Sequence, residues 1–292
     1  MTSTKNSTQK SVLSLKKSNK TDLSLHLSKH HPCYNETAHY TISRLHLPVA
    51  RSCNIQCNFC DRRISQYYHA SRPGITSKII TPQEALNFTL EVLTRDPRLK
   101  VVGIAGPGEP LYNHETFETL ELLHDYVPEL HLCICTNGLL LPNKIDLLVK
   151  FGVSYITVTL NAIAPAIASR IYHHINYLDE RFYGVEGSEL LIRNQLTGIA
   201  TAVKNKALVK INTVLIPTIN FDHIIDIARK AAELGAYIMN IIPLIPLGSF
   251  TNMSEPTCKQ LKLVRVIAET VIPQFRLCRQ CRADACGIPG LE

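Results

Sequence analysis

Three cysteines in one short loop have a spacing that suits an iron–sulfur cluster. Cys53, Cys57 and Cys60 form a C-x3-C-x2-C pattern directly after a short apolar segment. Thiolates at this spacing can bind three irons of a [4Fe–4S] cubane and leave the fourth iron without a protein ligand. The alternative is a structural zinc site, but zinc normally takes four protein ligands in paired motifs. The spacing therefore favours a cluster with one open iron.

An open iron in turn predicts a cofactor. It can take the amino and carboxylate groups of S-adenosylmethionine (SAM), and one electron from the cluster then cleaves the sulfonium to a 5′-deoxyadenosyl radical. The segment Gly106-Pro107-Gly108-Glu109-Pro110 suits such a site. Glycine lets backbone approach the methionyl group, and Glu109 can accept from its ammonium. Alone, this segment could be only a turn. Together with the cysteine loop it predicts a radical SAM enzyme.

The elements that must position these loops alternate along the chain. Short apolar runs separated by amphipathic segments predict six parallel strands, at Leu45–Val49, Val101–Ala105, His131–Cys135, Tyr155–Leu160, Leu208–Leu215 and Tyr237–Ile242. Thr81 and Asn143 are the expected caps of two of the helices between them. A full eight-unit barrel needs more sequence, and Tyr172–Gly187 is interpreted as irregular. We therefore expect an α/β fold, a partial (β/α)6 TIM-like barrel with an irregular C-terminal segment.

The net charge of +7 raises the question of a nucleic-acid or membrane partner. Residues 1–30 carry a net charge of +5, which leaves only +2 for the rest. They lack aromatic residues and are rich in Ser, Thr and Asn, so we expect a disordered basic tail followed by one domain, residues 31–292. A near-neutral body and the lack of a secretory signal or a membrane-spanning run predict a cytoplasmic protein without nucleic-acid or membrane partners.

Ten cysteines in a reducing compartment point to metal or redox chemistry rather than to disulfides. Cys133 and Cys135 share one face of a predicted strand. For Cys133 alone a buried core residue is the commoner explanation, and Cys135 is interpreted as core. The pair Cys278-x2-Cys281 could be half of a zinc site or a redox pair, and the arginines beside it could stabilise a negatively charged cluster.

Several long motifs make the chain resemble the NifB family, radical SAM proteins that build the carbide-centred core of nitrogenase cofactors. The resemblance runs from about His31 to Gly287. Its carriers are His31-Pro32-Cys33-Tyr34, Leu45-His46-Leu47-Pro48-Val49-Ala50, Cys53–Cys60, Ser71-Arg72-Pro73-Gly74, Gly106–Leu111, Thr136-Asn137-Gly138 and Cys278-Arg279-Gln280-Cys281-Arg282-Ala283-Asp284.

The resemblance implies two further [4Fe–4S] clusters, which are substrates. Cys33, His46 and Cys133 would bind the first, and Cys278 and Cys281, in a cluster-binding segment 274–292, the second. One SAM would donate a methyl group to a cluster sulfide, and a second would yield the radical that abstracts a methyl hydrogen. Fusion of the two units would give an eight-iron precursor with a central carbide, so the enzyme would be of the transferase and lyase type.

Partners and SAM contacts follow from the same resemblance. It implies an iron–sulfur cluster donor, carrier and scaffold proteins of nitrogenase assembly, and a reductant of the ferredoxin or flavodoxin type. Together with the strand-end positions it suggests Glu109, Thr136, Asn137 and Asn161 as SAM contacts, with Asn212 and Ile242 as further candidates.

The residues themselves agree, because Cys33, His46 and Cys133 could converge on one cavity, and a mixed Cys/His set suits a cluster that must leave. Many relatives carry a cysteine between Arg63 and Ser71. This chain has none there, although His69 could substitute, and it has an additional Cys286, which is either a ligand or a packed thiol.

Two other functions stay open on the sequence. The chain could be a radical SAM enzyme acting on an organic or peptide substrate, with Cys278 and Cys281 holding an auxiliary electron-transfer cluster. It could also be an iron–sulfur storage or carrier protein that does not cleave SAM.

Overall fold

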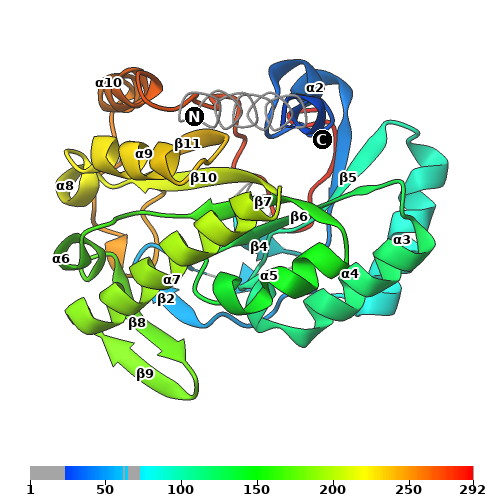
Figure 1. Ribbon diagram of the computed structural model, residues 1–292, viewed down its shortest axis with the longest axis horizontal. Coiled ribbons are helices and arrows are strands. Elements are labelled where there is room, and N and C mark those ends of the chain that lie inside the picture. The colour runs from blue at the N-terminus through cyan, green and yellow to red at the C-terminus, as the bar shows by residue number, and fades with distance from the viewer. Residues whose placement is uncertain (1–23, 62, 65–72, 292) are drawn as a thin grey trace, which may run out of the picture.

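Six parallel strands form the centre of the fold. The computed structural model describes residues 24–61, 63–64 and 73–291. The parallel strands are β1 (Ser43–His46), β5 (Leu99–Ile104), β6 (His131–Thr136), β7 (Val153–Thr159), β10 (Leu208–Leu215) and β11 (Ile238–Pro243). With the antiparallel β12 (Cys286–Gly287) they make a seven-stranded sheet in the order β11-β10-β7-β6-β5-β1-β12. Figure 1 shows the part of this sheet from β11 to β5. The curled, open sheet confirms the predicted partial barrel.

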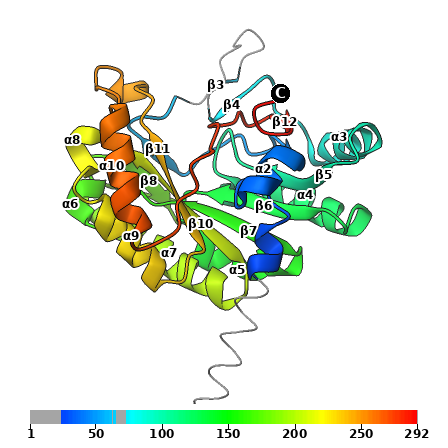
Figure 2. The same ribbon diagram turned by 90° about the horizontal axis from the view of Figure 1, so that it is seen from above.

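Helices cover the outer face of this sheet (Figure 2). The longer ones are α3 (Pro82–Arg95), α4 (His114–Tyr126), α5 (Leu141–Lys150), α7 (Gly184–Lys204), α9 (Ile224–Glu233) and α10 (Cys258–Glu269). Alternate residues of the strands, such as Leu45, Ile134 and Ile211, join helix residues in one large core. This burial of one strand face and one helix stripe is what an α/β fold requires.

The two helix caps that were expected from the sequence have different outcomes in the structure. Thr81 caps α3 with the expected capping box, in which Glu84 reaches back to the Thr81 backbone. The cap expected at Asn143 is wrong, because the N-cap of α5 is Leu140, three residues earlier, and the helix begins at Leu141. Pro142 occupies its first turn, where the missing N–H of proline is tolerated. The shorter helical elements are α2 (Glu36–Thr41), α6 (Pro165–Ala168), α8 (Pro217–Asn220), η1 (Pro110–Tyr112) and η2 (Gly248–Phe250).

The stretch interpreted as irregular, Tyr172–Gly187, contains a β-hairpin, so that prediction is wrong. β8 (Tyr172–Tyr177) and β9 (Glu180–Tyr183) pair antiparallel, and β8 also pairs with β2 (Ile55–Cys57). The turn has positive φ at Leu178 and Asp179, residues that give little sequence signal for such a conformation. The hairpin thereby supports the cysteine loop from the side. A separate pair of short parallel strands comprises β3 (Arg63–Ile64) and β4 (Ile75–Thr76).

A C-terminal segment, residues 274–287, crosses the open side of the barrel, and we call it the strap. At one end Gln274 bridges to Met239 of β11, and the Phe275 N–H donates to the Met239 carbonyl. At the other end β12 pairs with β1. Figure 2 shows this red segment running from beside α10 to β12. The strap therefore contacts both edges of the parallel sheet and covers its inner face.

Residues 24–30 belong to the tail that was expected to be disordered, but they are ordered in the structure. Residues 24–28 are helical, Ser28 is buried, and the Leu27 carbonyl accepts a hydrogen bond of 2.7 Å from the Tyr155 hydroxyl. Residues 1–23 lie outside the described residues. Across residues 24–291, apart from 62 and 65–72, no helix is long and apolar enough to cross a membrane.

Candidate active site

The cysteine loop lies at the carboxyl end of β1, where barrel enzymes place their chemistry. Cys53 precedes β2, Cys57 ends it opposite Tyr172 of β8, and the Cys60 N–H donates to the Cys57 carbonyl at 3.0 Å. All three side chains are partly exposed, and none of the ten cysteines of the chain is in a disulfide. The structure therefore brings the three predicted thiols together in one loop.

The glycine-rich segment after β5 holds the start of this loop. The Gly108 N–H donates to the Ala50 carbonyl at 2.7 Å, and the Glu109 N–H donates to the Ser52 carbonyl at 2.8 Å. A Cβ on Gly108 would lie only 2.2 Å from the Ser52 oxygen. Only glycine allows this approach, so the backbone contact explains the residue better than a turn alone.

Asn113, which the sequence analysis missed, fixes the same loop. Its side-chain oxygen accepts from the Ser52 N–H at 3.0 Å, and its amide donates to the Ser52 carbonyl at 2.8 Å. A single asparagine beyond the Gly106–Pro110 motif has no distinctive sequence signal. Its role becomes visible only when the two loops lie side by side.

Glu109 is a supporting residue in this structure. Its carboxylate is buried and accepts hydrogen bonds from the Thr136 hydroxyl, the Asn137 N–H and the Leu111 N–H. Burial raises the pKa of Glu109 to about 7, although these hydrogen bonds oppose the shift. The side chain thus connects the segment after β5 to the end of β6, and its contact with the SAM ammonium remains a prediction.

Among the four expected SAM contacts, Asn137 reaches furthest toward the cluster cysteines. Its amide nitrogen lies 2.7 Å from the Asn54 side-chain oxygen and 4.0 Å from the Cys53 sulfur. The Asn54 amide nitrogen itself is buried and has no hydrogen-bond partner among the described residues. A buried donor without an acceptor is unfavourable, so it fits a site completed by a bound group.

Thr136 and Asn161 lie behind this position. Thr136 is buried between Glu109 and the Gly138 N–H. Asn161 is fully buried, donates to the Tyr172 hydroxyl and accepts from the Val214 N–H. Asn212, a further candidate, accepts from the Asn240 amide on β11. These residues connect neighbouring strand ends, Asn212 is partly exposed, and the expected contacts with SAM remain predictions.

The inner face of the sheet carries a second group of candidate ligands. In the register of the sheet, His46 of β1 lies opposite Gly103 of β5, and Gly103 lies opposite Cys133 of β6. A Cβ on Gly103 would come within 3.3 Å of the His46 ring. The missing side chain therefore leaves room for the His46 ring to lie over Gly103, on the face that the strap covers.

The His46 ring is set up to use its outer nitrogen. Its Nδ1 lies 3.0 Å from the Arg282 carbonyl of the strap, and a carbonyl can only accept, so Nδ1 carries the proton. Burial lowers the pKa of His46 to about 4, which keeps the ring neutral at pH 7. Nε2 therefore presents a lone pair, and such a fixed tautomer is typical of a metal-binding histidine.

Cys33 and the strap cysteines approach the same region. The Cys33 N–H donates to His31 Nδ1 at 3.0 Å, and burial raises the pKa of the Cys33 thiol to about 12. Cys278 and Cys281 are among its electrostatic neighbours. Arg44 of β1 donates to the Cys281 sulfur at 3.1 Å. The structure thus gathers all five candidate ligands of the substrate clusters around the inner face of the sheet.

Two further cysteines, Cys135 and Cys286, lie in different surroundings. Cys135, interpreted from the sequence as core, lies on the inner face with Cys133 and is partly exposed. The hydrogen bond between these two thiols lowers the pKa of Cys135. Cys286 lies opposite Leu45 and packs against the main core, so the structure favours a packed thiol. His69, like Ser71 and Arg72, lies outside the described residues.

These residues fit iron–sulfur clusters better than a single ion. Within the described part of the chain, no three His, Cys, Asp or Glu side chains are grouped closely enough to hold one metal ion. The ligands of a cubane bind different irons, so they stand further apart than the ligands of one ion. Three unbridged thiols in one loop and a neutral histidine across from a cysteine have the donor chemistry that such clusters use.

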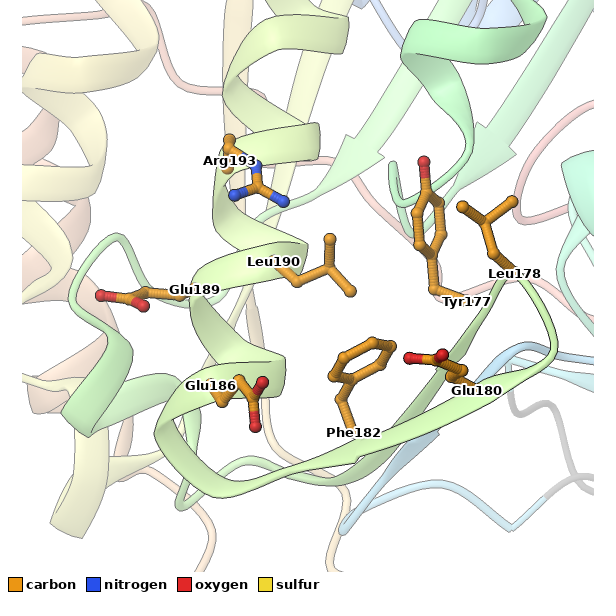
Figure 3. A pocket seen from close by; sticks show the side chains of 8 residues that line it. All are labelled: Tyr177, Leu178, Glu180, Phe182, Glu186, Glu189, Leu190 and Arg193. Atoms are coloured by element: carbon orange, nitrogen blue, oxygen red, sulfur yellow. The ribbon is translucent and has the colours of Figure 1, made fainter.

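A surface pocket of about 390 Å³ lies away from both groups. It opens between the β8–β9 hairpin and α7, with Phe182 and Leu190 at its apolar floor and Glu180, Glu186 and Arg193 around it (Figure 3). It contains none of the candidate ligands and carries no part of the proposed chemistry.

Comparisons with known proteins show the family of the chain. The model of the radical SAM superfamily matches residues 47–231. The FeMo cofactor biosynthesis protein NifB of Methanocaldococcus jannaschii is 46% identical over 92% of this chain and 90% of that protein. NifB of Methanocaldococcus infernus is 46% identical, covering 90% and 87%. NifB of Klebsiella pneumoniae is 43% identical, covering 89% of this chain and 57% of that protein.

Solved structures show the same fold at low identity. A radical SAM methyltransferase from Sphaerobacter thermophilus matches with a TM-score of 0.54 and 19% identity, over 80% of this chain and 64% of that one. Streptococcus suis SuiB matches with a TM-score of 0.56 and 14% identity, over 79% and 48%. The superfamily model and the long, close matches to archaeal relatives establish that this chain belongs to the NifB family of radical SAM enzymes.

Proposed function

We propose that this enzyme fuses two [4Fe–4S] units and inserts a SAM-derived carbide, forming the eight-iron precursor of the nitrogenase cofactor. One observation carries the proposal. His46, Gly103 and Cys133 lie side by side in the sheet, and the Arg282 carbonyl of the strap, next to Cys281, contacts the His46 ring. A radical SAM enzyme needs only the cluster of the cysteine loop to cleave SAM. A second set of candidate iron ligands inside the barrel therefore favours a further function, the binding of substrate clusters.

The SAM side of the site consists of residues at the carboxyl ends of β1, β5 and β6. Cys53, Cys57 and Cys60 would hold the resident [4Fe–4S] cluster that membership of the superfamily implies. When bound, that cluster and SAM supply one-electron cleavage of the sulfonium. Asn137 contacts the loop beside Cys53, and Glu109 holds the Asn137 backbone in place.

The substrate side would use labile ligands. A neutral His46 can bind one iron through Nε2 and can release it again without leaving a charge behind. Cys33 and Cys133 would complete the first substrate site. Cys278 and Cys281 would hold the second unit from the strap, which contacts the sheet at its edges and can move away there more easily than a core strand. Two units brought together in this way would be placed for fusion.

The proposed reaction also sets the partners. The iron and sulfide must come from a cluster donor, the electrons from a ferredoxin- or flavodoxin-type reductant, and the product must pass to carrier and scaffold proteins of nitrogenase assembly. Such exchange requires a reducing compartment, which the cytoplasm provides and which suits ten cysteines without a disulfide.

The experiment follows the methyl group of SAM. Anaerobically reconstituted protein is given SAM labelled at the methyl carbon together with a reductant, and the label is measured in acid-released methanethiol and in the cluster product. Wild-type protein should transfer the label to cluster sulfide. His46→Ala and Cys33→Ala should still cleave SAM but lose transfer, whereas Cys53→Ala should lose both. Cys258→Ser, which changes an exposed cysteine on α10, is the matched control and should behave as wild type.

The outcomes separate the candidate functions. Transfer that is unaffected in the His46 and Cys33 variants would contradict the proposed substrate site. Wild-type protein that cleaves SAM but never labels acid-labile sulfide would favour an organic or peptide substrate. Protein that binds clusters and forms no 5′-deoxyadenosine would be a storage or carrier protein.

A further inference from the structure

A buried lysine stands among the proposed substrate ligands. Lys210 lies on β10, is 5% exposed, and shares a row of the sheet with Thr157 of β7 and Cys135 of β6. Its ammonium lies 5.1 Å from the centre of the Tyr34 ring and 5.6 Å from that of Phe275. Alternation along β10 places it on the inner face, because its neighbours Val209 and Ile211 are in the helix-side core.

The surroundings of Lys210 contain thiols but no carboxylate partner. Cys33, Cys135, Cys278 and Cys133 are its strongest electrostatic neighbours. Within the described residues, the Lys210 side chain forms no hydrogen bond or ion pair, and its ammonium makes cation–π contacts with the two aromatic rings. Burial of an ammonium without an anion is costly, and cation–π contacts recover only part of that cost. Among the described residues, Lys210 therefore has no anionic partner that offsets the free-energy cost of burying its ammonium group.

We propose that Lys210 positions and holds the anionic iron–sulfur substrate by supplying a positive charge at the floor of the substrate site. The inference rests on the proposed function and names a residue that the ligand assignments leave out. A cubane with thiolate ligands is negatively charged, and its charge and hydrogen bonds set its stability and reduction potential. A fixed ammonium among Cys33, Cys133 and Cys278 would be the complementary charge.

This role is distinct from that of a structural lysine. A residue that stabilises the fold through its own contacts would stabilise the protein without clusters as well. A residue placed for an absent anion destabilises the protein without clusters and stabilises only the loaded form. The two cases therefore predict opposite signs for the effect of neutralising Lys210 on the unfolding free energy of the cluster-free protein.

The test compares Lys210→Met, Lys210→Arg and wild type in the full chain. Lys204→Met, at the exposed end of α7, is the matched control. Each protein is measured first without clusters, by denaturant unfolding, and then after reconstitution, by iron and sulfide content, loss of iron to a chelator and the reduction potentials of the clusters. The resident SAM cluster serves as the internal reference in every sample.

We expect Lys210→Met to be at least as stable as wild type without clusters. After reconstitution it should release substrate-cluster iron about tenfold faster, which corresponds to the loss of about 1.4 kcal/mol of stabilisation by the charge-assisted contact. Any substrate cluster that remains should have a more negative reduction potential. Lys210→Arg should retain most of the iron, and the SAM cluster and the Lys204→Met control should be unchanged.

Two results would overturn the inference. One is a Lys210→Met protein that retains the substrate iron and the potentials of wild type. The other is a variant that is destabilised without clusters but loads normally when folded, because that is the behaviour of a structural lysine. Wild-type protein that never binds more than one cubane would instead refute the proposed function, and this inference with it.

Discussion

Asp284 holds the strap in place over the proposed substrate site, and its substitution should loosen the strap. One carboxylate oxygen accepts from the Ser77 N–H at 2.7 Å and from the Ser77 hydroxyl at 3.0 Å, beside β4, while the other accepts from Arg282 at 2.7 Å. The Ala283 N–H also donates to the Ile75 carbonyl. Asp284→Asn keeps the size of the side chain and removes its charge.

The expected magnitude follows from the pKa of Asp284. Burial alone would raise this pKa, but the hydrogen bonds from Arg282 and Ser77 outweigh it and lower the pKa from 3.8 to about 2. One pKa unit corresponds to about 1.4 kcal/mol, and solvent screening reduces the contribution because the side chain is 19% exposed. We therefore expect the opening free energy of the strap to fall by about 1–2 kcal/mol at pH 7.

The sign of the pH dependence is fixed by the direction of the shift. A carboxyl group with a depressed pKa in the folded state contributes stability above its unfolded pKa, near 3.8, and loses that contribution as the pH falls toward about 2. The difference between wild type and Asp284→Asn should therefore be present at pH 7 and shrink below pH 4.

Hydrogen–deuterium exchange of the cluster-free protein measures this opening directly. Backbone amides of residues 278–285 should exchange about 5- to 30-fold faster in Asp284→Asn than in wild type at pH 7. Asp96→Asn is the matched control, because the pKa of Asp96 is also lowered to about 2, but through Arg98 and Ser43 and outside the strap. Equal strap exchange in wild type and Asp284→Asn, or a difference that grows as the pH falls, would refute the reasoning.

Three further substitutions test the two sites. Gly108→Ala should destabilise the cluster-free protein by about 1–3 kcal/mol in denaturant unfolding and abolish SAM cleavage, because its Cβ would meet Ser52 backbone atoms. Gly103→Ala should displace the His46 ring, and iron analysis should show loss of substrate-cluster iron with the SAM cluster retained. Glu109→Gln should change the pH dependence of the unfolding free energy. Burial raises the pKa of Glu109 to about 7. The stability that protonated Glu109 contributes is therefore present below about pH 4.5 and is lost as the pH rises toward 7. Wild type should therefore lose about 3 kcal/mol relative to the variant over that range.

Each of these predictions has a contradicting result. Gly108→Ala with the stability of wild type would mean that the loops tolerate a Cβ at this contact. Gly103→Ala that loads as much iron as wild type would show that cluster binding does not depend on the position of the His46 ring over Gly103. If the unfolding free energies of Glu109→Gln and wild type vary with pH in the same way from pH 4.5 to 7, the buried carboxylate does not titrate in that range.

Local signals in the sequence were sufficient for most of the scaffold. Strands such as Leu208–Leu215 and the capped helix at Thr81 depend on the alternation of apolar residues and on a capping box, both of which are read from neighbouring positions. The hairpin at Tyr172–Tyr183 was missed because Leu178 and Asp179 adopt positive φ without the glycine or asparagine that usually marks such a turn.

The sequence predicted which residues form the candidate site, but it did not predict how these residues are arranged in space. Motif spacing identified the cysteine loop and, through the family resemblance, His46 and Cys133. The register that sets Gly103 between the latter two depends on pairing among three strands, which no local pattern specifies. Lys210 looked like any lysine of an alternating strand, and its burial among thiols appears only when the chain ends fold over the sheet.

The central claim is that this chain holds substrate clusters at a site separate from its SAM cluster, and one measurement tests it most directly. Iron and sulfide are counted in reconstituted wild type and in a variant with Cys53, Cys57 and Cys60 all changed to alanine. Three cubanes hold about twelve irons, so we expect that amount in wild type and about eight irons, with no SAM cleavage, in the variant. A wild type with about four irons and a variant with none would contradict the claim.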